Sequence, residues 1–232
     1  MRGSRSVNCP KHGHRASMEG NIEGISCCFD DESKRMLKDY RKDGLDDTSM
    51  VVSDALSERE LAGTSILELG CGIGALSLDL LKKGAGSVHG MDLSPAMVEL
   101  ARSLAAEAGV SQKASFERGD GAVADLPNSD VVILDKVLCC YPDVVALVTN
   151  SSSAARRYYV FSLPNERRAV TRFLRLFIPL QSIFSRRNSF RFFIHSTSQI
   201  EEKLKAKGFT PIFESKVGWI WSVFIFAAPA AQ

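Results

Sequence analysis

The chain has 232 residues, of which 45% are hydrophobic and 24% are charged, a composition typical of a globular protein with one sizeable core. The formal net charge of +2 is too small to indicate a nucleic-acid-binding protein, and no apolar run approaches the roughly 20 residues of a membrane-spanning helix. The amino terminus lacks the apolar core of a secretory signal, and a chain of this length does not need its six cysteines as a disulfide scaffold. We therefore expect a cytoplasmic protein.

The amino-terminal segment is predicted to form a tail followed by helices. Residues 1–24 are polar with scattered glycines, which is typical of a flexible tail. Residues 25–62 are predicted to form a helical cap, because apolar residues such as Met36, Leu37 and Tyr40 recur at helical spacing. The dipeptide Asp43-Gly44 separates this stretch into two helices.

Cysteines and histidines near the amino terminus raise the alternative of a zinc site. The candidates are Cys9, His12, His14, Cys27 and Cys28. Their spacings match no ordered metal-binding pattern, so we expect no metal.

Residues 63–228 are predicted to form a single α/β domain, because apolar runs alternate with helical stretches. The predicted strands are 65–69, 87–91, 114–118, 130–134 and 158–162, and the predicted helices are 75–82, 95–108, 143–152 and 198–207. The carboxyl-terminal stretch is predicted to form two antiparallel strands joined near residues 216–218. Residues 229–232 are predicted to form a short tail.

An insertion at residues 164–193 is rich in arginine and phenylalanine. Three interpretations stay open for it. It could be a surface helix that packs its phenylalanines inward, a lid over an apolar and acidic ligand, or a surface for peripheral membrane contact.

The stretch "ILELGCGIG", residues 66–74, ends a predicted strand in a glycine turn where a ligand can approach the backbone. Gly70, Gly72 and Ala75 also satisfy the dinucleotide fingerprint, so an NAD(P)-dependent oxidoreductase is an alternative. Glu68, however, would repel a pyrophosphate and suits a ligand that carries an ammonium or a sulfonium.

Carboxylates follow the next three predicted strands. In a parallel sheet the ligand lies beyond the carboxyl ends of the strands, so Asp92, Asp120 and Asp135 are expected to face it. Asp92 suits the two hydroxyls of a ribose, and Asp120 can accept a hydrogen bond from an adenine amine.

The motifs "LELGCGIG", "GMDLSP", "GDGAVADLP" and "VVILDKVLCCYPD", in this order, resemble those of class I S-adenosylmethionine-dependent methyltransferases. The resemblance extends to magnesium-protoporphyrin O-methyltransferases and their unassigned bacterial relatives. It implies a Rossmann-like, seven-stranded and mostly parallel sheet with an antiparallel last strand, and S-adenosylmethionine as the cofactor. The cofactor-binding residues that it implies are Glu68, Gly70, Cys71, Gly72, Gly74, Asp92, Leu93, Asp120, Gly121 and Asp135.

Three residues are candidates for a catalytic role at the acceptor. Cys140 stands where the porphyrin enzymes are expected to carry a histidine before Tyr-Pro. Tyr40 lies in the predicted cap, and His195 lies before the last predicted helix. Ordinary packing is the alternative role for each of them.

These features predict a methyltransferase that acts on a small, apolar and acidic molecule at an oxygen atom. The expected partner is this small-molecule acceptor, with no nucleic acid, and membrane contact through the insertion stays open. A cofactor-binding protein without catalytic activity is the second alternative, because the sequence shows no certain general base.

Overall fold

The computed structural model describes residues 18–165 and 191–229, in which seven strands form one sheet. The strand order is β3-β2-β1-β4-β5-β7-β6. The strands are β1 (Ser65–Leu69), β2 (Ser87–Asp92), β3 (Ala114–Arg118), β4 (Ser129–Leu134), β5 (Ala155–Pro164), β6 (Thr210–Val217) and β7 (Trp221–Ala227). Neighbouring pairs among β1 to β5 are parallel, whereas β7 runs antiparallel to both β5 and β6. The predicted fold class, with its antiparallel last strand, is confirmed.

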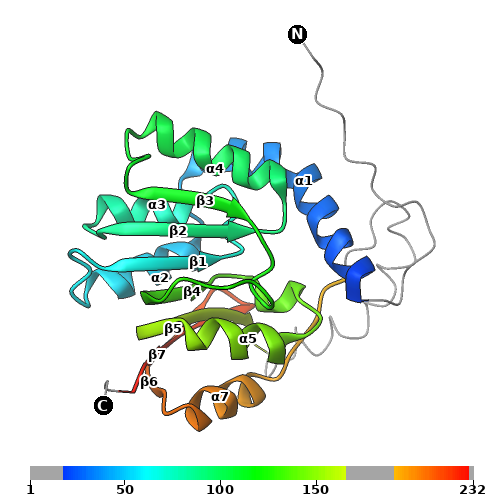
Figure 1. Ribbon diagram of the computed structural model, residues 1–232, viewed down its shortest axis with the longest axis vertical. Helices are drawn as coiled ribbons and strands as arrows, with labels where there is room; N and C mark the ends of the chain where they lie inside the picture. Colours follow the sequence, from blue (N-terminus) through cyan, green and yellow to red (C-terminus); the bar gives the residue numbers. More distant parts are fainter. Residues whose placement is uncertain (1–17, 166–190, 230–232) are drawn as a thin grey trace.

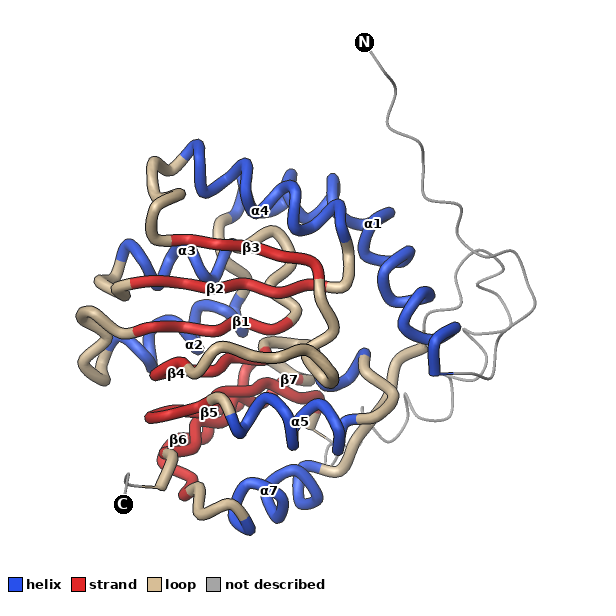
Figure 2. Tube along the Cα trace, in the orientation of Figure 1, coloured by secondary structure: helices blue, strands red, loops and turns tan. Residues whose placement is uncertain are grey.

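Helices cover both faces of this sheet (Figure 1). One face carries α2 (Asp47–Ser57), α3 (Ala75–Lys82) and α4 (Pro95–Glu107), and the long helix α1 (Met18–Asp43) packs beside α4. The other face carries α5 (Val144–Ser153) and α7 (Thr197–Ala206); in Figure 2, α5 lies in front of the sheet and α7 lies near its lower edge. A short 3-10 helix, η1 (Leu138–Cys140), follows β4.

The alternation of side chains along each strand divides the core into two clusters. Ile66 and Ile133 point toward the face of α2 to α4, and Leu67 and Val132 point toward the face of α5 and α7. Glu68 falls on the same side as Ile66, and its strand is paired with β4 at Ile133. The carboxylate of Glu68 is therefore directed toward the α3 face, at the carboxyl end of the sheet.

The amino-terminal region differs from its predicted boundary. Helix α1 begins at Met18, so residues 18–24 of the predicted flexible tail are helical. Two glycines in this stretch disfavour a helix in isolation, but Ile22 and Ile25 pack against the core cluster of α5 and α7. The remainder of the predicted tail, and residues 166–190 of the predicted lid, lie outside the described residues.

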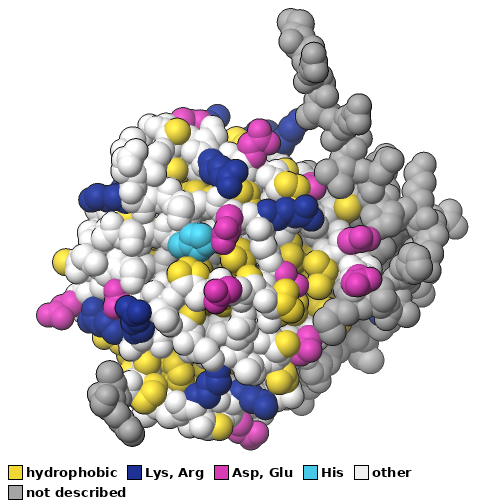
Figure 3. Space-filling view, in the orientation of Figure 1, with side chains coloured by type: hydrophobic (Ala, Val, Ile, Leu, Met, Phe, Trp, Pro, Cys, Tyr) yellow, Lys and Arg dark blue, Asp and Glu magenta, His cyan; other side chains and the backbone are white. Residues whose placement is uncertain are grey.

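The surface shown in Figure 3 carries acidic and basic side chains side by side, interspersed with apolar ones. Among the described helices, none combines the length and the apolar character that crossing a membrane requires.

Candidate active site

The loop between β1 and α3 brings bare backbone to the carboxyl end of the sheet. Gly70, Gly72 and Gly74 all have positive φ angles, of 65°, 53° and 75°. A side chain at Gly70 would also collide with Val137, whose Cγ2 lies 2.4 Å from where a Cβ would stand. At Gly72 a Cβ would meet only the methyl group of Met36, at 3.7 Å. The loop thus needs glycine for its backbone angles, and at Gly72 it opens onto free space.

Asp92 ends β2 and faces this loop. Its Oδ2 accepts a hydrogen bond from the backbone N–H of Gly72, and its Oδ1 accepts one from the N–H of Ser94, both at 2.8 Å. Burial raises the pKa of the Asp92 carboxyl above its ordinary value, although these two N–H groups oppose the rise. Each oxygen retains a lone pair, so the carboxylate can accept two hydroxyl groups from a ligand.

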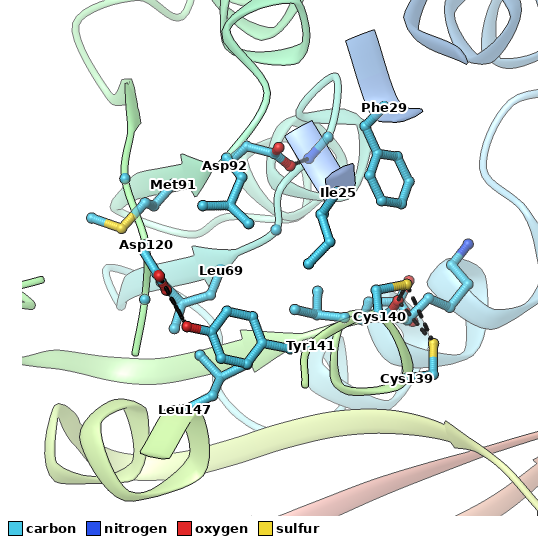
Figure 4. Close-up of a pocket in the computed structure, with 18 of the residues that line it drawn as sticks. Ile25, Phe29, Leu69, Met91, Asp92, Asp120, Cys139, Cys140, Tyr141 and Leu147 are labelled. Carbon is cyan, nitrogen blue, oxygen red and sulfur yellow. Dashed lines mark hydrogen bonds between the residues drawn. The ribbon is translucent and has the colours of Figure 1, made fainter. Parts of the chain in front are cut away.

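Asp120, beyond β3, is held by a tyrosine. The hydroxyl of Tyr141 lies 2.9 Å from both oxygens of the Asp120 carboxylate, and the backbone N–H of Ala122 donates to Oδ1 at 3.0 Å. Burial and the contact with Asp120 raise the pKa of the Tyr141 hydroxyl, so this hydroxyl acts as a proton donor. Asp120 is thereby fixed at the edge of the site (Figure 4).

Glu68 is the most deeply buried acid of the site, with 4% of its surface exposed. The hydroxyl of Ser77, on α3, donates a hydrogen bond to it. Burial raises the pKa of Glu68 from 4.5 to about 8, against the effect of Ser77, and the nearby Asp135 and Asp92 raise it further. A cation bound nearby would relieve this repulsion.

Asp135 follows β4 and accepts hydrogen bonds from two serines. The hydroxyls of Ser49 and Ser162 donate to its two oxygens, each at 2.6 Å. Burial raises the pKa of Asp135 above its ordinary value, and the ammonium of Lys136 acts in the opposite direction. The two serines come from α2 and β5, so the helical cap and the sheet both orient this carboxylate.

Two adjoining cavities lie at the carboxyl end of the sheet. The first, of about 330 Å³, is lined by adenosine-side candidates such as Asp92, Leu93, Asp120 and Gly121 and by an apolar wall beyond them. The second, of about 430 Å³, contains Glu68, Cys71 and several carboxylates. Met36, Gly70, Gly72, Asp135 and Lys136 line both. The two cavities therefore meet at the glycine loop and the end of β4.

Helix α1 forms the roof of the first cavity. Ile25 and Phe29 project from it toward Cys140 and Tyr141 (Figure 4). The helix is tied to the segment between β2 and α4, because the hydroxyl of Ser26 donates to the carbonyl of Leu93 at 3.0 Å. The site is consequently enclosed by the amino-terminal helix and bounded below by the sheet.

The residues at the ends of the strands fit S-adenosylmethionine. Asp92 and Asp120 offer hydrogen-bond acceptors for a ribose and an adenine amine. The glycine loop leaves room for the part of the ligand that runs from these two acids toward the second cavity. The second cavity combines buried carboxylates whose pKa values are raised. It therefore suits the ammonium and sulfonium cations of the ligand and would repel a pyrophosphate.

Comparisons with known proteins agree with this geometry. Residues 66–157 match the family model described as "Methyltransferase domain". A magnesium-protoporphyrin O-methyltransferase of Rhodobacter capsulatus is 29% identical over 161 residues, which cover 68% of either chain. The class I motifs, the family match and the acids at the strand ends coincide in one site.

Residues 66–157 form a class I S-adenosylmethionine-dependent methyltransferase domain.

This assignment replaces the dinucleotide oxidoreductase alternative. A further relative of the methyltransferase, a ubiquinone biosynthesis O-methyltransferase of Xanthomonas euvesicatoria, is 35% identical over 95 residues, which cover 40% of this chain and 39% of that one. The chain spans between 22% and 68% of the length of the first curated relatives that it matches.

Solved structures share the fold of the methyltransferase. Magnesium protoporphyrin IX methyltransferase from Synechocystis PCC 6803, with bound S-adenosylhomocysteine, superposes with a TM-score of 0.68 at 21% identity, over 87% of this chain and 98% of that one. A cyclase also superposes, with a TM-score of 0.62 at 16% identity, over 78% and 81%. The fold by itself therefore does not specify the reaction.

Nine of the ten predicted cofactor residues line one or both cavities and Gly74 lines neither, whereas the three catalytic candidates of the methyltransferase are dispersed. Cys140 lines the first cavity, and Tyr40 lines the second. His195 lines neither cavity, and its Nε2 lies 2.9 Å from the backbone carbonyl of Tyr141. Burial lowers the pKa of His195. A catalytic role for each of these residues stays a prediction.

Gly74 and Cys71 serve the loop of the methyltransferase in different ways. Gly74 precedes α3, and a Cβ there would lie 2.9 Å from the ring of Phe116, so its role is close packing. The buried thiol of Cys71 lies 3.7 Å from the carbonyl of Gly72, and burial raises its pKa well above the ordinary value. Cys71 is therefore a neutral wall of the second cavity.

Several side chains that hold the acids of the candidate site are not marked by any sequence pattern. Tyr141 stands in the motif "VLCCYPD", but only the fold reveals that its hydroxyl reaches Asp120. Ser49, Ser77 and Ser162 come from three separate elements, and no local pattern marks them. Among the described residues, no group of three or more His, Cys, Asp and Glu side chains could hold a metal ion.

Proposed function

We propose that this methyltransferase transfers a methyl group to a small, largely apolar molecule that carries an acidic group, and that the accepting atom is an oxygen. The observation that carries the proposal is the wall of the first cavity beyond Asp135. There the lining includes the apolar side chains of Val137, Phe192 and Trp221. A wall of this kind accommodates an apolar body next to the position of the reactive methyl.

The acidic group of the acceptor is inferred from the insertion. Its arginines can bind a carboxylate through two parallel hydrogen bonds. Arg191 is exposed and precedes Phe192, which lines the first cavity. The other arginines of the insertion lie outside the described residues.

Transfer to oxygen is supported by the relatives. The matched proteins of Rhodobacter capsulatus and Xanthomonas euvesicatoria are both named O-methyltransferases. An ajmaline N-methyltransferase of Rauvolfia serpentina also matches, at 34% identity over 84 residues, covering 36% of this chain and 28% of that one. Nitrogen acceptors therefore belong in the test of the proposal.

The described residues would act mainly through positioning. When bound, the cofactor supplies a methyl group on a positively charged sulfur. Asp92 and Asp120 hold the adenosine end, and Glu68 and Asp135 attract the charged end. Helix α1 excludes water from above. Displacement in line from a charged donor gains most from such orientation. Cys140 lines the same cavity as the apolar wall and is our candidate for contact with the accepting atom.

The proposal is tested by incubating the purified protein with S-adenosylmethionine and a panel of apolar carboxylic acids, phenols and amines. Mass spectrometry would detect acceptors that have gained one methyl group, together with S-adenosylhomocysteine. We expect turnover of an apolar acid, as an ester or as an ether elsewhere on the molecule. Turnover restricted to amines, or to molecules without an acidic group, would contradict the proposal.

Cofactor binding without turnover on any acceptor would favour the alternative of a non-catalytic protein. The cytoplasmic setting and the lack of nucleic-acid partners stay predictions from the sequence. Membrane contact through the insertion stays open in the same way.

A further inference from the structure

Lys136 has a backbone conformation that is costly for its residue type. Its φ angle is +58°, in the left-handed region that favours glycine. Neighbouring groups hold it there. Its N–H donates to the hydroxyl of Ser162 at 2.7 Å, and its carbonyl accepts the thiol of Cys139 at 3.4 Å. A long side chain at a position that glycine would occupy without strain points to a function for that side chain.

Acidic side chains outnumber basic side chains around Lys136. Lys136 is the one basic side chain among the described residues that line either cavity. The second cavity also contains five carboxyl side chains, which are Asp39, Asp43, Asp46, Glu68 and Asp135. Among its described lining residues, this cavity therefore offers several charged partners for a cation and one, Lys136, for an anion.

The ammonium group of Lys136 lies on the side of the second cavity. It forms an ion pair with Asp46, which lines that cavity and not the first. Asp46 is also the amino-terminal cap of α2, and its carboxylate accepts hydrogen bonds from the N–H groups of Thr48 and Ser49. More than half of the Asp46 side chain is exposed, at 55%, and ion pairs at such sites are weak. A carboxylate from a ligand can therefore compete for Lys136.

We propose that Lys136 binds the carboxylate of the methionine moiety of the cofactor, while Glu68 and Asp135 bind the ammonium group of the same moiety. The second cavity is then a site for an α-amino-acid zwitterion, whose ammonium and carboxylate groups are attached to the same carbon. Asp46 holds the lysine side chain in place while the site is empty. The inference rests on the cofactor assignment and is independent of the acceptor.

Calorimetry with two ligands tests this role without any turnover. S-adenosylhomocysteine carries the amino-acid zwitterion, and 5′-methylthioadenosine carries the same adenosine and thioether without it. In Lys136→Met, we expect S-adenosylhomocysteine to bind about 10-fold to 100-fold more weakly and methylthioadenosine to bind as in the wild type. Lys136→Arg, which keeps the positive charge, should restore most of the affinity for S-adenosylhomocysteine.

Two further variants distinguish the proposed role from a structural one. Asp46→Asn keeps the helix cap and removes the competing charge, so it should bind S-adenosylhomocysteine a few-fold more tightly than the wild type. Lys136→Gly removes the strained backbone, so it should melt at a higher temperature and still lose affinity for S-adenosylhomocysteine.

Equal losses for both ligands in Lys136→Met, or unchanged affinity for S-adenosylhomocysteine, would overturn the proposal. If the wild type bound neither ligand, the cofactor assignment itself would fail, which is a separate outcome. If Asp46→Asn weakened the binding of S-adenosylhomocysteine, Asp46 would not compete with the ligand for Lys136, and this part of the proposal would be wrong.

Discussion

The carboxylate of Asp92 and the backbone N–H of Gly72 are joined by a hydrogen bond of 2.8 Å that links the end of β2 to the glycine loop of β1. The same carboxylate lines the first cavity. One side chain thus shapes the loop that surrounds the ligand and also offers its remaining lone pairs to that ligand. Substitutions at either residue are therefore expected to affect the cofactor more than the fold.

Replacing Asp92 by alanine is expected to weaken the binding of S-adenosylhomocysteine by about 2 kcal/mol or more, because charge-assisted hydrogen bonds to two hydroxyl groups are lost. Isothermal calorimetry measures the change. Asp92→Asn serves as the control, since an amide oxygen can still accept the N–H of Gly72 but carries no charge. A folded Asp92→Ala variant with unchanged affinity would rule out the ribose role.

Replacing Gly72 by valine is expected to abolish detectable binding of the cofactor, because the side chain would enter the space where the two cavities meet. Gly63→Val is the matched control. Gly63 has a similar positive φ angle of 73°, and a Cβ there would meet no atom within 4 Å. Both variants carry the same kind of backbone strain. Thermal shift assays should therefore show similar losses of stability, with the shift by cofactor retained only in Gly63→Val.

Replacing Asp120 by alanine is expected to remove the preference for adenine. The wild type should bind S-adenosylhomocysteine about 10-fold more tightly than S-inosylhomocysteine, which lacks the exocyclic amine, because a hydrogen bond from this amine to a carboxylate is lost. In the variant the two affinities should become similar. Tyr141→Phe, which removes the hydroxyl that holds Asp120, should reduce the preference only partly. Equal affinities of the wild type for the two ligands would contradict the adenine role.

The ionisation of Glu68 predicts a pH dependence. Its pKa is raised from 4.5 to about 8 in the folded protein, so the folded state keeps a proton that the unfolded state has released between these values. The stabilising contribution of this group is complete below about pH 4.5 and is lost as the pH rises through about 8. The free energy of unfolding should fall by at most about 1.4 kcal/mol per pH unit in this window, and Glu68→Gln should flatten the slope.

The affinity for the cofactor should have the opposite pH dependence, because binding favours the form of Glu68 that has lost this proton. A cationic ligand favours the ionised form of Glu68, so S-adenosylmethionine should bind more tightly as the pH rises toward about 8. Calorimetry in two buffers of different ionisation enthalpy would detect the proton released on binding below that pH. A Glu68→Gln variant with the same proton release would show that another group is responsible.

Replacing Arg191 or Arg187 by alanine is expected to raise the KM for an acidic acceptor and to leave the affinity for S-adenosylhomocysteine unchanged. Arg191 immediately precedes Phe192 in the first cavity, whereas Arg187 lies outside the described residues. Steady-state kinetics with an acid and with its amide would measure the effect. A KM that does not change for the acid in either variant would remove the arginines from acceptor recognition.

The adenosine half of the site could be predicted from the sequence because it depends on local features. A glycine turn after a strand, and an acid after each later strand, are read directly along the chain, and parallel pairing brings them to one edge. Asp92 and Asp120 accordingly lie in one cavity. The strand boundaries were predicted to within a few residues for the same reason, since runs of buried apolar residues end where turn residues begin.

The rest of the site depends on contacts between distant segments. The start of α1 at Met18 was missed, because its glycines disfavour a helix and only packing against the sheet stabilises it. The left-handed backbone of Lys136 has no sequence signal, because neighbours from β5 and η1 impose it. Tyr40 and Cys140, predicted together, line different cavities, and spacing along the chain could not have revealed that separation.

The roof formed by α1 has a consequence for the speed of the catalytic cycle. Its residues Ile25 and Phe29 lie above the first cavity, and Ser26 ties the helix to the segment after Asp92. If S-adenosylhomocysteine formed beneath this roof leaves past α1, the amino-terminal half of this helix has to swing away first. Product departure, rather than methyl transfer, is then expected to limit the turnover number. A Ser26→Ala variant, which loses the hydrogen bond to Leu93, should turn over faster while binding its product less tightly.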